Sequence, residues 1–406
     1  MVVSGIGCSL VDYIYSNINF NNPAIKKYFS KNKFDGGLFP GGLVFVSELE
    51  NYTKQPIEKI IADITGDKEP DAINIGGPAI ASLIHCAQMV QKTEIKVKYY
   101  GSMGDDDTAE HIKNILKKTP INYDNYKIIR GYTPSTYVFS DPNYDNGQGE
   151  RMFVNNIGMA GNFSIFDIEA HFFKSNILLF GATALLPDIH DNLNNLLKRG
   201  KESGCVNVVS TVYDFRNTKI NPDGRWPLGD DDTNYKNTDL LITNYDEALK
   251  LSNTKDIDSA ANFFIKRQTP AFIITHGANP LYLYSGGSLF KKVNLTILPV
   301  SEYIKNILKT DKNVNVDTTG CGDNFVGGVL ASTAYQMLIK NTHSVDLPTA
   351  CAWGVVSGGF AKLYLGGTYL ENIPGEKAEK IQIIFDKYQK QIKNILTCVH
   401  NNFQIQ

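Results

Sequence analysis

The stretch "DTTGCGDNFVGGV", residues 317–329, gathers two acidic residues, two threonines and four glycines ahead of an apolar segment. The residues after Asp323 have helical periodicity, so Gly320, Cys321 and Gly322 are predicted to lie at a helix N-terminus. Backbone N–H groups at such a terminus point outward, and the helix dipole favours negative charge there. Glycines also let a phosphate approach the backbone closely. The stretch therefore predicts an anion hole.

Asp323 would then be a carboxylate in the first helical turn, beside the predicted anion site. There it can accept a proton from an attacking hydroxyl. Phosphoryl transfer needs both parts, because charge on the moving phosphoryl group must be stabilised while the nucleophile loses its proton. The competing interpretation is structural: Asp323 caps the helix and the glycines form a turn.

Composition places the chain among ordinary globular proteins. Its 406 residues are 42% hydrophobic and 20% charged, enough for a large core. The formal net charge is −2 and no Lys/Arg block stands out, which argues against a nucleic-acid or membrane partner. The six cysteines include no C-x-x-C pair, and we interpret them as reduced thiols. Because there is no basic leader and no stretch of ~20 apolar residues, we expect a cytoplasmic protein.

The order of elements predicts an α/β fold. Apolar, β-branched runs alternate with helical periodicity, which is typical of a mostly parallel sheet with helices on both faces. The candidate strands are residues 2–7, 95–101, 176–181, 206–214, 239–244 and 271–277.

Two segments break this rhythm, residues 13–60 and residues 131–155, and the second carries the hairpin signal "NYDNGQGE". We expect them to form a small β-rich lid over the carboxyl edge of the sheet, where ligands bind. Residues 375–398 are amphipathic and predict a surface helix. Residues 1–406 are thus expected to form a single domain with an inserted lid.

The opening stretch resembles the C-terminal signature of the ribokinase-like (PfkB) carbohydrate kinases, which transfer the γ-phosphate of ATP to a sugar or nucleoside hydroxyl. Further landmarks of that family follow in its order: Asp12, "GGPA" at 76–79, "GSMGDDD" at 101–107, "GERMF" at 149–153, "YDFR" at 213–216, "TNYDE" at 243–247 and "THG" at 275–277. The match spans nearly the whole chain. The resemblance implies a three-layer ribokinase-like fold, ATP and Mg²⁺ as cofactors, and a small-molecule sugar or nucleoside as substrate.

The resemblance assigns roles in catalysis and nucleotide binding. Asp323 matches the catalytic base, and the backbone of residues 320–322 matches the anion hole. Asn244 and Glu247 match an Asn-x-x-Glu motif that organises Mg²⁺ through its waters, although an N-cap with a capping Glu has the same spacing.

Four further residues match the nucleotide and cation sites. Thr275 and Gly277 resemble part of the nucleotide-binding wall, for which an ordinary turn at a strand end is the alternative. Asp317 and Thr319 resemble a loop that binds a monovalent cation in many members, so K⁺ is a further cofactor that the resemblance suggests.

For the acceptor, the family pattern points to Asp12, because a buried carboxylate at a strand end can bind two vicinal hydroxyls. Gly76 and Gly77 would let the acceptor approach the start of the following helix. Arg151 is a candidate substrate or lid residue. The alternatives are an aspartate in a surface turn and, for Arg151, a solvated charge.

The sequence departs from the family pattern near the double glycine. Pro78 follows it, and the asparagine that many sugar-specific members carry a few positions later is missing. Asp12 and Gly76 are also separated by an unusually long segment, which predicts an enlarged lid. A sugar is the expected acceptor, with a nucleoside as the runner-up and a non-catalytic sugar or nucleotide sensor as the alternative from another class. Lids of this kind often pair between subunits, so a homodimer through the lid is a further expectation.

Overall fold

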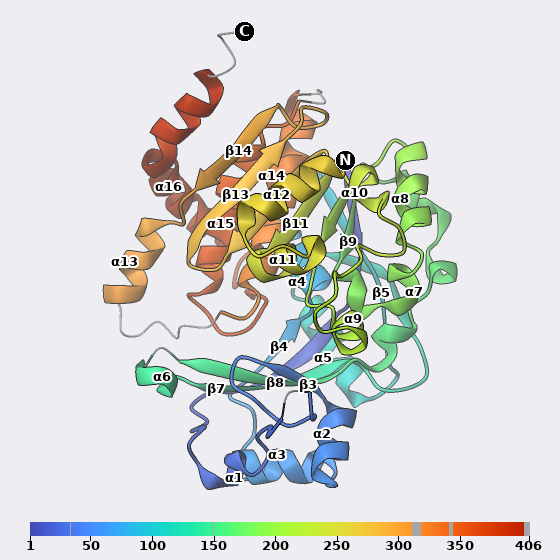
Figure 1. Ribbon diagram of the computed structural model, residues 1–406, viewed down its shortest axis with the longest axis vertical. Helices are drawn as coiled ribbons and strands as arrows, with labels where there is room; N and C mark the ends of the chain where they lie inside the picture. The colour runs from blue at the N-terminus through green and yellow to red at the C-terminus, as the bar shows by residue number, and fades with distance from the viewer. Residues whose placement is uncertain (33, 148, 311–317, 341–343, 402–406) are drawn as a thin grey trace.

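A computed structural model of the chain describes residues 1–32, 34–147, 149–310, 318–340 and 344–401. Its centre is a nine-stranded sheet with the order β14-β13-β12-β11-β10-β9-β1-β5-β6 (Figure 1). All neighbouring strands from β12 to β6 in this order pair in parallel. Strand β13 pairs antiparallel with both β12 and β14. Their bounds are β1 (Val2–Ile6), β5 (Lys96–Met103), β6 (Asn122–Ile128), β9 (Ile177–Gly181), β10 (Val206–Ser210), β11 (Leu240–Asn244), β12 (Ala271–His276), β13 (Asn279–Ser285) and β14 (Val293–Leu298).

Helices cover both faces of this sheet, because its inner strands are apolar on both sides. On β9, Leu179 belongs to the core cluster of one face and its neighbour Phe180 to the cluster of the other. The predicted α/β, mostly parallel, three-layer fold is therefore confirmed.

The first face carries α4 (Pro78–Val90), α5 (Asp107–Leu116), α13 (Glu302–Thr310), α14 (Cys321–Lys340), α15 (Leu347–Ala361) and α16 (Glu376–Asn401). The second carries α7 (Pro187–His190), α8 (Leu193–Glu202), α10 (Asn234–Asn237), α11 (Tyr245–Ser252) and α12 (Ile257–Lys266). Short 3₁₀ helices lie at Gly158–Asn162, Ile165–Asp167, Ala170–Lys174 and Thr183–Leu185. The C-terminal segment expected to be helical lies within α16.

A second, five-stranded sheet forms the lid, with the order β3-β8-β7-β2-β4. Its elements are β2 (Leu10–Tyr15), β3 (Leu43–Phe45), β4 (Ala72–Gly76), β7 (Ser135–Asp141), α6 (Tyr144–Gly147) and β8 (Glu150–Asn156). Strands β7 and β8 form an antiparallel hairpin, and β4, outside the two expected segments, is an edge strand.

Residues 13–60 are less rich in strand than the sequence analysis expected. They contribute α1 (Pro23–Lys26), α2 (Val46–Thr53) and the start of α3 (Ile57–Thr65). On α3 the buried side chains recur at Ile57, Ile60, Ile61 and Ile64, which is a helical period.

The two faces of the lid sheet differ in chemistry. One face packs Tyr15, Phe139 and Val154 against α1 to α3, which lie below the sheet in Figure 1. The opposite face carries Asp12 and faces the carboxyl edge of the central sheet. A homodimer through the lid stays a prediction, and it would have to use the edge strands because helices of the same chain cover the outer face.

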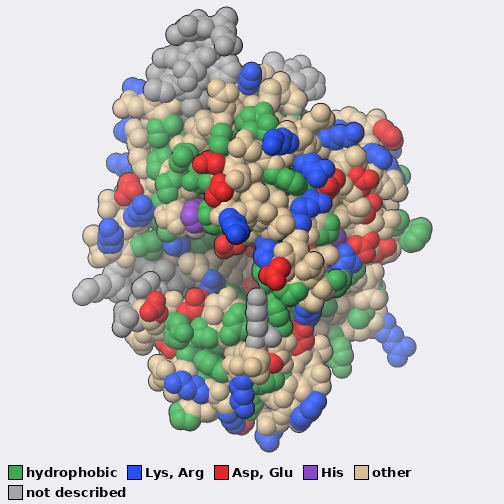
Figure 2. Space-filling model, in the orientation of Figure 1, with side chains coloured by type: hydrophobic (Ala, Val, Ile, Leu, Met, Phe, Trp, Pro, Cys, Tyr) green, Lys and Arg blue, Asp and Glu red, His purple; other side chains and the backbone are tan. Residues whose placement is uncertain are grey.

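On the side drawn in Figure 2, the described acidic and basic side chains are interspersed, and they form no large patch of a single charge. No helix in the described ranges is long and apolar enough to span a bilayer.

Candidate active site

The loop before α14 is held in an open turn by close glycine contacts. Gly320 has φ +71°, and a Cβ atom on it would lie 2.6 Å from Cα of Gly367. Within the described ranges, no carbonyl accepts a hydrogen bond from the N–H of Gly322 or Asp323, whereas the N–H of Cys321 donates to the Thr318 carbonyl at 3.3 Å. Two N–H groups at the start of a 20-residue helix are thus available to an anion.

Asp323 lies in the first turn of α14 with its side chain partly buried. Loss of hydration, and to a smaller extent the negative charge of Glu247, raise the pKa of Asp323 to about 7. A carboxyl group with this pKa gains and releases a proton near neutral pH, as a general base must.

Glu247 and Asn244 lie where β11 passes into α11. Asn244 caps the helix, accepting from the Glu247 N–H at 2.9 Å, and its amide donates to Glu247 Oε1 at 2.7 Å. The buried carboxylate also accepts from the hydroxyl of Thr211 at 2.5 Å, a partner that the sequence analysis missed. Burial raises the pKa of Glu247. The capping geometry is therefore present, and it leaves the predicted role of these two residues toward Mg²⁺ as a prediction.

Thr275 and Gly277 close the next strand, β12, beside this pair. Thr275 donates to the Thr243 carbonyl at 3.4 Å, and Gly277 has φ +56° with open space where a Cβ would lie. The imidazole of His276 stacks on Tyr245 with ring centroids 4.2 Å apart. These residues form an open, partly aromatic rim at the carboxyl ends of β11 and β12.

Asp12 lies in the lid strand β2 and is 4% exposed. Its carboxylate packs against Gly76, where a Cβ atom would lie 2.1 Å from Asp12 Oδ2. Gly77 begins α4 with φ +105°, and a Cβ there would lie 2.6 Å from the carbonyl oxygen of Cys8. Any side chain at position 76 or 77 would collide with Asp12 of the lid or with the loop after β1, so both positions require glycine.

Arg151 extends from β8 of the lid to the loop before α14, where its guanidinium donates to the hydroxyl of Thr319. Asp317, the other residue expected near a monovalent cation, lies outside the described residues. The described residues contain no group of three or more His, Cys, Asp or Glu side chains arranged to hold a metal ion. Arg151 therefore joins the lid to the predicted anion loop, a contact that the sequence alone does not reveal.

A second contact joins the lid to α9 (Phe215–Ile220) of the central domain. The rings of Phe45 and Phe215 meet edge to face with centroids 5.3 Å apart. Lys219 forms an ion pair with Glu48 of α2, and its ammonium lies 5.1 Å from the centroid of the Phe45 ring. The lid therefore contacts the central domain through β8 and through β3 with α2.

Two further polar residues lie in line with Asp12 on the inner lid face. Asp12 pairs with Thr136 of β7, and Thr136 pairs with Asn155 of β8, so the three side chains share one face of the sheet. Asn155 donates to the Thr136 hydroxyl at 2.8 Å, while its buried Oδ1 has no hydrogen-bond partner among the residues that the structure describes. In the sequence, only an alternation of polar and apolar residues marks Thr136 and Asn155. Their place beside Asp12 follows from the register of the strands.

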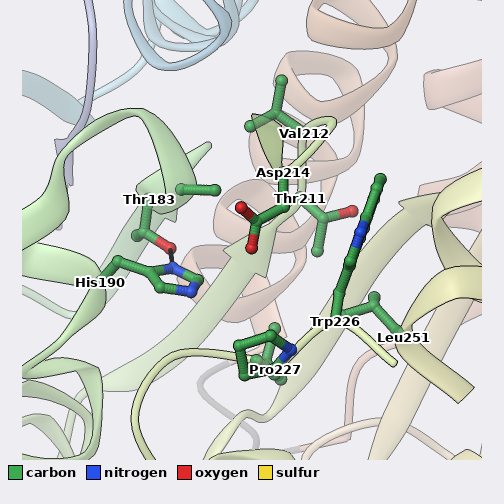
Figure 3. A pocket seen from close by; sticks show the side chains of 10 residues that line it. Thr183, His190, Thr211, Val212, Asp214, Trp226, Pro227 and Leu251 are labelled. Carbon is green, nitrogen blue, oxygen red and sulfur yellow. Dashed lines mark hydrogen bonds between the residues drawn. The ribbon is translucent and has the colours of Figure 1, made fainter. Parts of the chain in front are cut away.

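A small pocket opens beside Thr211, at the carboxyl ends of β9 and β10 (Figure 3). His190 and Asp214 point into it, and Trp226 forms one wall. The Asp214 carboxylate caps α9 by accepting from the Asn217 N–H at 2.9 Å. Arg216 pairs with Asp191, so the "YDFR" segment does not form an internal Asp-Arg pair.

Comparisons with known proteins identify the family of the chain and solved structures of similar fold. Residues 44–371 match the family described as "pfkB family carbohydrate kinase". The ribokinase of Schizosaccharomyces pombe is 24% identical over 295 residues, which cover 70% of this chain and 81% of that protein.

Solved structures of similar fold include an adenosine kinase from Sinorhizobium meliloti, with a TM-score of 0.67, 16% identity, and coverage of 94% of this chain and 98% of that one. The adenosine kinase of Schistosoma mansoni in complex with 2-fluoroadenosine has a TM-score of 0.66 and 17% identity, covering 90% and 96% of the two chains. Ribokinase from Thermotoga maritima has a TM-score of 0.58 and 15% identity, covering 94% and 99%. At these identities the structures are similar in fold alone.

Proposed function

Because the chain belongs to the pfkB family of carbohydrate kinases, we propose that it transfers the γ-phosphate of ATP to a hydroxyl of a small carbohydrate. In this proposal Asp323 is the base that takes the hydroxyl proton. The backbone of residues 320–322, with the adjoining N–H of Asp323, stabilises the charge on the phosphoryl group in flight. Thr275 and Gly277 contribute to the nucleotide-binding wall.

The observation that carries the proposal is the position of Asp323 at the start of α14. Its pKa is raised to about 7, and it lies beside N–H groups that lack an acceptor among the described residues. A carboxylate that only caps a helix accepts hydrogen bonds from backbone N–H groups, and these bonds lower its pKa. A base next to an anion hole is the arrangement that phosphoryl transfer requires.

The residues around Glu247 fit Mg²⁺. Glu247 is buried, its described hydrogen-bond partners are all neutral, and its charge raises the pKa of Asp323. A divalent cation that keeps several waters would relieve this repulsion while using one carboxylate and the Asn244 amide. When bound, Mg²⁺ neutralises charge on the phosphates of ATP. The monovalent cation expected at Asp317 and Thr319 stays a prediction.

The inner face of the lid supports an acceptor that bears several hydroxyls. Asp12, Thr136 and Asn155 form a buried polar row, and Asn155 Oδ1 is available to accept a hydrogen bond. A buried acceptor without a partner is costly, so a substrate hydroxyl that satisfies it gains affinity. Gly76 and Gly77 stay proposed acceptor contacts at the start of α4, where Gly76 packs against the Asp12 carboxylate.

A nucleoside is the second candidate, and a separate observation favours it. Phe45 pairs with Asn155 across β3 and β8, so an aromatic ring ends the polar row. The Phe45 ring contacts the ring of Phe215, which in turn contacts that of Tyr213, with the last two centroids 4.7 Å apart. Ribose hydroxyls would meet the polar row while the base meets the aromatic rings.

ATP consumption with Mg²⁺ across pentoses, hexoses, phosphosugars and nucleosides tests the proposal, with Asp323→Asn run beside the wild type. Turnover on one acceptor that is lost in the variant would support the kinase and identify its acceptor. Phe215→Ala separates the two candidates, because it should raise KM for a nucleoside and leave KM for a simple sugar unchanged. Ligand binding without turnover on any acceptor would favour a sensor instead.

A further inference from the structure

A lysine is buried in the first turn of α16, close to the predicted anion loop. Lys377 is 1% exposed, and its ammonium donates to Gln88 Oε1 and to Asn324 Oδ1, both at 3.0 Å. In the described part of the chain no carboxylate forms a salt bridge with it, and Glu371 instead accepts from its backbone N–H at 2.9 Å. Burial lowers the pKa of Lys377 to about 7. Burying an ammonium with only the charge of Glu371, which forms no salt bridge with it, to offset the loss of hydration is costly, and this makes a purely packing role a poor explanation.

The Lys377 ammonium fixes the orientation of the Asn324 amide. In its protonated form Lys377 donates hydrogen bonds and accepts none, so the amide atom that faces the ammonium must be the oxygen. The same oxygen receives the Tyr364 hydroxyl at 3.1 Å and lies 2.7 Å from Nδ1 of the buried His85. The opposite amide orientation would bring an NH₂ group against the ammonium, so Lys377 excludes it.

With its oxygen fixed, Asn324 must direct its NH₂ group at two backbone carbonyls. These belong to Gly320 and Gly367, each at 2.8 Å from Nδ2. Gly320 precedes α14 in the predicted anion loop, and Gly367 lies in the loop after α15. A peptide group is planar, so fixing the Gly320 carbonyl also fixes the plane of the Gly320–Cys321 peptide, directly ahead of the N–H groups of Gly322 and Asp323. The amide thus holds two loops together at the point where a phosphate is expected.

We propose that Lys377 is a positioning residue for phosphoryl transfer, and that it holds the 320–322 loop in its anion-binding form by fixing the Asn324 side chain. This inference rests on the proposed kinase function. Lys377 contacts neither substrate in this account. It acts through Asn324, the residue next to Asp323 in the sequence, so both the anion hole and the base depend on it.

The direct test compares Lys377→Met with Gln88→Leu. Methionine keeps the length of the side chain and removes its charge, whereas leucine at position 88 removes the other acceptor of the ammonium and leaves the Asn324 contact in place. We expect Lys377→Met to lower kcat by between about tenfold and a hundredfold, the range expected when reacting groups are misplaced, with little change in KM for the acceptor. Gln88→Leu should lower Tm and keep kcat near the wild-type value. Equal kcat in Lys377→Met and wild type would overturn the inference while leaving the kinase proposal intact.

A readout that needs no turnover separates this inference from the proposed function. Cys321 lies in the loop and is partly exposed, whereas Cys8, Cys86, Cys205 and Cys351 are buried. In a Cys398→Ser background, the rate at which a thiol reagent labels Cys321 reports the order of the loop. Lys377→Met should label faster than wild type, and Gln88→Leu should not.

If Lys377→Met does not fold, Lys377→Gln serves in its place. Glutamine keeps a hydrogen-bond donor but also carries an acceptor, so it no longer excludes the wrong Asn324 orientation. Faster labelling and reduced kcat are again expected. Wild-type labelling and wild-type kcat in Lys377→Gln would overturn the proposal.

Discussion

The guanidinium of Arg151, on the last strand of the lid, donates a hydrogen bond to the hydroxyl of Thr319, in the loop that leads into α14. The same guanidinium lies 5.1 Å from the centroid of the Phe153 ring, which supports it from one side. Arg151 thus carries positive charge from the lid to the predicted phosphate site.

Arg151→Lys tests whether this placement serves catalysis. Lysine keeps the charge and loses the planar fork of donors, which is matched to phosphate oxygens. We expect kcat to fall by roughly a hundredfold, the usual effect of losing one donor to a transition-state oxygen. Lys27→Met is the control, because it removes a charge from the outer side of the lid, where Lys27 pairs with Asp63. Comparable losses in both variants would contradict a specific role for Arg151.

The raised pKa of Asp323 predicts how activity and stability depend on pH. The base must be deprotonated, so kcat/KM should fall as the pH drops below about 7, the pKa of Asp323. Between its ordinary pKa of 3.8 and about 7, the folded protein holds a proton that the unfolded chain has released. The free energy of unfolding should therefore decrease as the pH rises through this window. Chemical denaturation at a series of pH values, with Asp323→Asn as the control lacking this slope, checks the sign.

Asn155→Ala tests the polar row of the lid. The variant removes the buried Oδ1, which has no partner in the described part of the chain, and the hydrogen bond that the Asn155 amide donates to Thr136. KM for the acceptor should rise by roughly tenfold, about the contribution of one hydrogen bond to a buried group, while KM for ATP stays the same. Steady-state kinetics with each substrate varied in turn make the measurement. A change confined to KM for ATP would place Asn155 outside the acceptor site.

Much of this arrangement follows from the sequence. Six strands of the central sheet, β1, β5 and β9 to β12, were predictable because buried parallel strands are continuous apolar runs, whereas β6, β13 and β14 were not predicted. Asp323, Gly320 and Gly322 were predictable because their spacing to the helix is local. The Lys377–Asn324 contact was not, since it joins residues 53 positions apart and helical periodicity does not identify the neighbour of each buried side chain. The row from Asp12 to Asn155 depends on strand register, which no local pattern specifies. Helices α1 to α3 were missed because a short helix depends on tertiary packing more than on its own sequence.

Lys219→Met tests the second lid contact and should have a small effect. The Lys219–Glu48 pair is 47% and 30% exposed, and pairs of this kind contribute at most about 1 kcal/mol. Weaker lid closure should raise KM for the acceptor by less than about fivefold, and high salt should reduce the difference from wild type. A loss larger than tenfold would mean that Lys219 contacts a substrate.

The central claim is that Asp323 is the base of a phosphoryl transfer, and the most direct test is to measure turnover and ATP binding in Asp323→Asn. Asparagine keeps the shape of the side chain and cannot accept the proton. We predict that ATP binds with nearly wild-type affinity while turnover falls by roughly a hundredfold to ten-thousandfold, as for loss of a general base. Weakened ATP binding with unchanged turnover of the bound complex would contradict the account.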